Sequence, residues 1–146
     1  MHGFTHFGMA LAKSVSFDLC PRLARLKKRR LYLPKGLDVP PILRPIVAET
    51  VSRRAVGRGW DEFLRLGASV KHGWCPATEA LGRFGSAAAG ASAGDPVDET
   101  GDALGKLLRT LYICDYLSNP VFRTETLDLL NQGEAVHSLQ PPSITG

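Results

Sequence analysis

The chain has 146 residues, which fits one globular domain, and 44% of them are hydrophobic while 22% are charged. This balance excludes a disordered chain. No apolar run approaches the ~20 residues that span a bilayer, and the first residues lack the charged-then-apolar order of a secretory signal. We therefore expect a cytoplasmic protein with no membrane partner.

The net charge of +4 is distributed unevenly along the chain. Residues 1–75 carry fourteen Lys/Arg and five Asp/Glu, whereas residues 76–146 carry four Lys/Arg and nine Asp/Glu. A basic first half favours a polyanion such as DNA as a partner. The alternative is two solvated surfaces that bind nothing.

The first predicted helix covers residues 5–15. Phe7, Leu11 and Val15 recur at helical spacing on one face, and Thr5 can cap the first turn. A turn is expected directly after this helix.

A run of cations follows the first helix. Six of the nine residues 22–30 are basic and none is acidic. Pro21 is expected to open a short helix that docks through Leu23 and Leu26. The cations then either contact DNA phosphates or form a solvated helix face. The candidate DNA-binding residues are Arg22, Arg25, Lys27, Lys28, Arg29 and Arg30.

The middle of the chain reads as one strand, a connector and short helices. Residues 31–33 predict a strand that ends at Pro34, and the prolines of residues 35–45 exclude a regular helix. Trp60 and Trp74 are expected to be packing anchors. Helical patterns are predicted over residues 46–56, 61–69 and 77–84.

The second half contains the clearest amphipathic helix, which ends at Asn119-Pro120. Two further helices are predicted over residues 121–130 and 134–140, after a Gly/Ala/Ser-rich loop at residues 85–96. The expected fold class is mainly α, with at most one short strand. The apolar face of the amphipathic helix is expected to comprise Leu104, Leu107, Leu111, Cys114 and Leu117.

Few residues suggest chemistry, and no phosphate-cradling loop or other small-molecule signature is present. Three separated cysteines, Cys20, Cys75 and Cys114, are expected to be buried thiols. His2 and His6 lack the glutamate of a zinc motif. Glu134, three residues before His137, offers either a carboxylate ligand for Mg²⁺ or a favourable charge at a helix start.

Several short sequence motifs together resemble the catalytic region of Tn3-family transposases. They occur in the same order as in the family and cover about residues 2–140. The motifs are His2-Gly-Phe-Thr-His6, Phe17-Asp-Leu-Cys-Pro-Arg-Leu23, Leu31-Tyr-Leu-Pro-Lys-Gly-Leu37, Arg83-Phe-Gly-Ser-Ala-Ala88, Leu104-Gly-Lys-Leu-Leu-Arg-Thr-Leu111, Cys114-Asp-Tyr-Leu-Ser-Asn-Pro120 and Leu130-Asn-Gln-Gly-Glu-Ala-Val-His137.

The resemblance implies an RNase H-like DDE domain, in which two aspartates and one glutamate hold two Mg²⁺ ions for DNA cleavage. It assigns Glu134 as the third acid, both catalytic and metal-binding. In the family motif Asp-Thr-(His or Gly)-Gly-(Phe or Tyr)-Thr, Met1 takes the place of the first threonine. The second acid is then expected one position before Met1, and the first acid further upstream.

The resemblance also divides the chain into four regions. Residues 1–34 would be part of the RNase H-like region after the second acid, and residues 35–118 the helical insertion. Residues 119–140 would return to the catalytic region with the third acid, and residues 141–146 form a divergent tail.

The expected function is that of a Tn3-family transposase fragment that serves DNA transposition but is inactive by itself. With one of three acids, the fragment is expected to bind no Mg²⁺ alone. The alternatives are a module that binds DNA or full-length transposase without catalysis, and a non-functional remnant that folds poorly.

Overall fold

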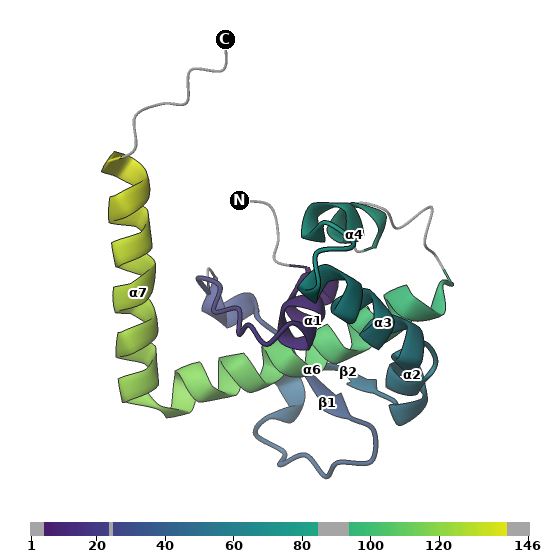
Figure 1. Ribbon diagram of the computed structural model, residues 1–146. Coiled ribbons are helices and arrows are strands. Elements are labelled where there is room, and N and C mark those ends of the chain that lie inside the picture. Colours follow the sequence, from purple (N-terminus) through teal and green to yellow (C-terminus); the bar gives the residue numbers. More distant parts are fainter. Residues whose placement is uncertain (1–4, 24, 85–93, 140–146) are drawn as a thin grey trace.

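The computed structural model describes residues 5–23, 25–84 and 94–139. These residues form six α-helices and one two-stranded parallel sheet, so the mainly α class is confirmed. The long helix α6 (Pro96–Ser118) runs through the molecule, and most of the other elements pack along it (Figure 1). Within the described ranges, no helix combines the length and apolarity needed to cross a membrane.

Helix α1 (His6–Ser14) crosses α6 at close range. The Thr5 hydroxyl caps α1 by accepting the Gly8 N–H at 3.0 Å, and the side chains of Phe7 and Leu11 are buried, as predicted. A Cβ atom on Gly105 of α6 would overlap the backbone of His6. The absence of that atom allows the two helix backbones to approach closely.

The sheet contains one strand more than the sequence predicted. Strand β1 (Leu31–Pro34) matches the expected position, and it pairs in parallel with β2 (Val47–Val51). The helix expected over residues 46–56 was therefore wrong in its first half, where β-branched residues suit a strand. Helix α2 (Arg53–Gly57) follows directly, and the connector contains only the 3₁₀ turn Arg44–Ile46.

Helices α3 (Trp60–Lys71) and α4 (Ala77–Arg83) confirm two further predictions. Their inward residues complete the main core around the ring of Phe7, which packs edge-on against Phe63 and stacks on Phe84. The buried members of this core are Phe7, Ala10, Leu11, Phe63, Ala80 and Phe84.

The predicted tryptophan anchors were wrong. Trp60 is 39% exposed and Trp74 is 79% exposed. Phe63, three residues after Trp60, occupies the inward side of α3 instead. Trp74 follows the end of α3 and stacks on the ring of His72 outside the core.

The buried face of α6 differs in part from the predicted leucine face, of which Leu104 is partly buried against the main core. Leu111 and Leu117 are 62% and 50% exposed, and Cys114 is also exposed. Small residues face α1 along the first half of α6, because the close helix crossing leaves no room for leucine there. The buried residues of α6 are Thr100, Gly101, Ala103, Gly105, Thr110, Tyr112 and Ile113.

Helix α6 ends at Asn119-Pro120, as predicted, and α7 (Pro120–Leu139) begins there. The Asn119 side chain accepts the Phe122 N–H at 3.1 Å and so caps α7. The two helices predicted in this region form one, because the glycine at position 133 does not interrupt the helix. Figure 1 shows α7 turning away from α6 and standing beside the body of the molecule.

The remaining predictions concern cysteines and terminal segments. All three cysteines are free thiols, as expected, but Cys20 and Cys75 are only partly buried and Cys114 is exposed, so the expected burial was wrong. Most of the predicted 85–96 loop, the 141–146 tail and His2 lie outside the described residues, as does the side chain of His137.

Candidate functional site

The segment 17–23 connects the body of the protein to α7. The Tyr112 hydroxyl of α6 donates to the Pro21 carbonyl oxygen at 2.9 Å. The guanidinium of Arg22 then reaches α7, where its Nη2 donates to the Asn131 Oδ1 at 3.1 Å and forms an ion pair of 3.0 Å with the Glu134 Oε1. Residues from two separate motifs, 17–23 and 130–137, therefore meet at the side chain of Arg22.

Glu134 is an accessible carboxylate on α7. Its side chain is 69% exposed, and that of Arg22 is 45% exposed. Because α7 continues through residue 133, Glu134 lies inside the helix rather than at its start. The alternative explanation is therefore wrong about the helix start, although Glu134 is exposed as that explanation expected. An exposed ion pair contributes only about 0–1 kcal/mol, so other ligands can compete for this carboxylate.

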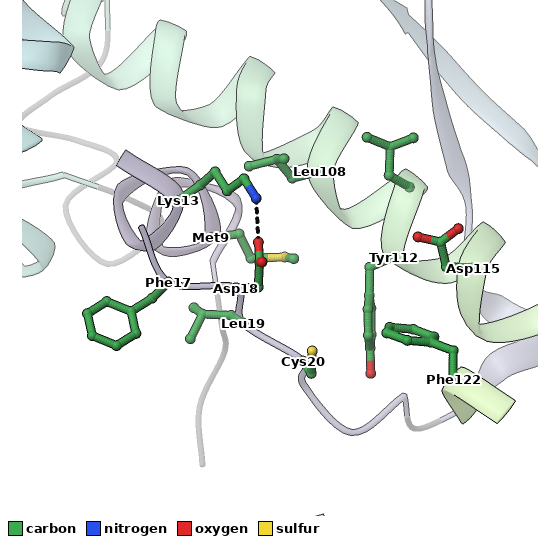
Figure 2. A pocket seen from close by; sticks show the side chains of 11 residues that line it. Met9, Lys13, Phe17, Asp18, Leu19, Cys20, Leu108, Tyr112, Asp115 and Phe122 are labelled. Atoms are coloured by element: carbon green, nitrogen blue, oxygen red, sulfur yellow. Dashed lines mark hydrogen bonds and ion pairs between the residues drawn. The ribbon is translucent and has the colours of Figure 1, made fainter. Parts of the chain in front are cut away.

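A pocket of about 310 Å³ lies between the segment 17–23 and the end of α6 (Figure 2). The Lys13 ammonium and the Asp18 carboxylate form an ion pair of 2.6 Å at its edge. Burial raises the pKa of Tyr112 to about 12, which keeps its hydroxyl protonated as a donor. The lining residues are Met9, Lys13, Phe17, Asp18, Leu19, Cys20, Leu108, Leu111, Tyr112, Asp115 and Phe122.

The basic segment does not form the expected helix from Pro21. Its described residues contain only the 3₁₀ turn Leu26–Lys28, which follows Arg25 in a left-handed conformation with φ 53°. Neighbouring like charges disfavour a helix here. Leu26 is 37% exposed rather than docked on the core.

The six candidate DNA-binding cations have different surroundings. Arg22 is bound to α7, and Arg30 donates to the Pro45 carbonyl oxygen at 2.6 Å. Arg29 is partly buried, whereas Arg25, Lys27 and Lys28 are exposed. Of these six cations, Arg22 is the one that the described residues show in contact with Glu134.

A polar cluster that the sequence analysis missed joins α1, both strands and α6. The His6 ring lies 3.3 Å from the Asp102 carboxylate and 3.4 Å from the Arg109 guanidinium. Lys106 bridges Asp102 and Glu49 of β2. The hydrogen bond with His6 lowers the pKa of Asp102, against the effect of burial and with the help of Lys106.

The magnesium chemistry that the resemblance implies finds one suitable group here. A carboxylate oxygen is the hard ligand that Mg²⁺ prefers, and Glu134 supplies one. Across the described ranges, no three His, Cys, Asp or Glu side chains lie close enough together to hold a metal ion. Glu134 therefore fits as one contributor to a metal site, and the described residues do not complete such a site.

Nearly the whole chain, including the helix that carries this carboxylate, matches a family of transposases. The family described as Tn3 transposase DDE domain matches residues 1–142. The chain belongs to the Tn3 transposase family. This confirms the family resemblance inferred from the sequence motifs.

Individual relatives agree with the family assignment. The chain is 43% identical over 145 residues to the transposase for insertion sequence element IS1071 in transposon Tn5271 of Comamonas testosteroni. It is 35% identical to the transposase for transposon Tn501 of Pseudomonas aeruginosa and 34% identical to that for transposon Tn21 of Escherichia coli, each over 137 residues.

The matches cover 99% of this chain for the first relative and 94% for the other two, but 14% of each transposase. The chain thus corresponds to about one seventh of their length. No solved structure matches this chain.

Proposed function

We propose that this chain is a transposase segment that serves DNA transposition by Mg²⁺-dependent cleavage and strand transfer, with Glu134 as the third acid. Membership of the Tn3 transposase family carries the proposal. The exposure of the Glu134 carboxylate supports it, because a metal ligand must be accessible.

The proposed role of Glu134 is to offer an oxygen ligand to Mg²⁺ in a site completed by other residues of a larger transposase. When bound, Mg²⁺ would supply Lewis-acid activation at a DNA phosphate. In cleavage, a water oxygen bonds to phosphorus and the bond to the 3′-oxygen breaks. In strand transfer, the freed 3′-hydroxyl oxygen bonds to a phosphorus of the target DNA, the bond between that phosphorus and the target's 3′-oxygen breaks, and the proton of the attacking hydroxyl passes to the released oxygen.

We further propose the domain division given by the resemblance. Residues 1–34 and 119–140 would belong to the RNase H-like region, residues 35–118 to its helical insertion and residues 141–146 to a divergent tail. Two features support this division. The boundary near residue 119 coincides with the break between α6 and α7, and strand β1 lies at the end of the first region.

The first test concerns the chain alone. With one predicted acid, it is expected to leave DNA that carries transposon ends intact in the presence of Mg²⁺. Nicking or strand transfer above the background of a Glu134→Gln variant would contradict this expectation.

The second test places the chain in a complete enzyme. The 43% identical transposase would receive this chain in place of its matching segment. Glu134→Gln is expected to abolish strand transfer, and Glu125→Gln, an exposed glutamate of the same helix, should leave it unchanged. Full activity of Glu134→Gln would remove Glu134 from the catalytic set.

A second candidate function is DNA binding without catalysis, favoured by the exposed cations Arg25, Lys27 and Lys28. Each phosphate contact releases counterions, so affinity should fall steeply with salt. Replacing Lys27 by Ala is expected to reduce the slope of log affinity against log salt by roughly 1, whereas Lys71→Ala, at the end of α3, should not. Mobility-shift titrations measure both slopes, and a salt-independent affinity would exclude phosphate contacts.

A further inference from the structure

We propose that Arg22 is the positioning residue of Glu134. Its guanidinium would fix the Glu134-bearing half of α7 against the segment 17–23 and hold the carboxylate in one orientation. This inference rests on the proposed function of Glu134, and it assigns Arg22 a role different from the phosphate contact predicted from the sequence.

The contacts of one arginine nitrogen carry this inference. The Nη2 atom of Arg22 lies 3.1 Å from the Asn131 Oδ1 and 3.0 Å from the Glu134 Oε1. Asn131 and Glu134 are three residues apart on α7 and therefore share one face of the helix. A single side chain thus binds two consecutive positions on that face.

The position of α7 makes this contact important. Its first turns are joined to α6, where Phe122 packs edge-on against Tyr112 and Arg123 donates to the Tyr116 carbonyl oxygen at 3.1 Å. Among the side chains described, Thr126 is the last buried one of the helix. Beyond it, the Arg22 contacts tie α7 to the body of the molecule, while the helix stands apart in Figure 1.

The geometry also suits a metal ligand. Carboxylates that bind metals are usually held by a further hydrogen bond, which fixes their orientation. The ion pair joins Arg22 to the Oε1 oxygen of Glu134, and in this proposal the cation binds the Oε2 oxygen.

The first experiment measures the position of α7 in the 146-residue chain. Spin labels are attached at Lys71→Cys and Ser138→Cys in a background with Cys20, Cys75 and Cys114 replaced by Ser. Arg22→Ala is expected to broaden the distance distribution, with a roughly fivefold rise in the undocked population when an exposed ion pair and a neighbouring hydrogen bond are lost. Lys35→Ala, an exposed cation of the connector, is the matched control and should leave it unchanged.

The second experiment uses the complete transposase that carries this chain. Arg22→Ala is expected to raise the Mg²⁺ concentration for half-maximal strand transfer about tenfold to a hundredfold, the effect typical of losing a group that orients a metal ligand. Arg22→Lys keeps the charge and a donor and should restore part of that shift. Lys35→Ala again serves as the control.

The outcomes separate this inference from the proposed function. An Arg22→Ala chain with the parent distance distribution would overturn the positioning role, as would an unchanged or lower Mg²⁺ requirement. A loss of DNA affinity with normal Mg²⁺ dependence would make Arg22 a phosphate contact instead. Activity of Glu134→Gln would reject the proposed function, whatever Arg22→Ala does.

Discussion

Glycine at one position of α6 determines how closely two helices pack. A Cβ on Gly105 would overlap the His6 backbone, so Gly105→Ala must separate α1 from α6. Overpacking of this kind costs about 1–3 kcal/mol or more, which exceeds the ~1 kcal/mol gain in helix propensity. We expect a net loss of unfolding free energy in urea titrations.

Gly133 provides the matched control for that substitution. It lies in α7 with open space around the position of a Cβ atom, so Gly133→Ala should stabilise the chain by up to ~1 kcal/mol. Equal effects of the two substitutions would show that close packing at residue 105 is unimportant.

The carboxylate of Asp102 gives stability a specific pH dependence. Its pKa is lowered, chiefly by the hydrogen bond with His6, so its contribution is present above the ordinary value of 3.8 and is lost as pH falls through the lower folded value. Asp102→Asn should therefore destabilise the chain at neutral pH, by an amount that shrinks below pH 3.8. Urea unfolding between pH 2.5 and 7 measures this. Destabilisation that stays constant across this range would contradict the assignment.

At the scale of elements, local patterns predicted the first helix and the first strand well. Thr5 and the apolar spacing of Phe7 and Leu11 are local signals that the structure retains. The second strand could not be distinguished from a helix, because its pairing partner lies sixteen positions earlier, at Leu31 opposite Val47. The predicted leucine face of α6 was wrong at Leu111 and Leu117 for a related reason: which side of that helix is buried depends on α1.

The corner between α2 and α3 depends on one hydroxyl of α6. Thr100 is fully buried, accepts the Gly59 N–H at 2.9 Å and donates to the Val56 carbonyl oxygen at 3.0 Å. Thr100→Val leaves both backbone groups without this partner and should cost about 2–3 kcal/mol. Thr124→Val, at an exposed position of α7, should cost far less. Thermal unfolding of the two variants compares them, and similar midpoints would refute this role of Thr100.

At the scale of the whole molecule, the candidate site shows the limit of prediction from sequence. Glu134 was identified through the family motif at residues 130–137, and its neighbour Asn131 belongs to the same motif. No local pattern links Arg22 to them across more than a hundred residues. The signal that could have connected them was that both segments resemble the same family, yet only the folded chain shows that they touch.

The same arrangement predicts unequal stability along the chain. The centre of α6 packs against α1, the sheet and α3, whereas the second half of α7 is mostly exposed and is tied to the body through Arg22. Amides in regions with few buried contacts open at lower free energy. Hydrogen exchange should therefore be slowest around Tyr112 and faster after Leu130.

Arg22→Ala should accelerate exchange after Leu130 while leaving α6 unchanged, because the ion pair supports only that part of α7. Equal protection of both helices would mean that contacts other than Arg22 hold α7 in place.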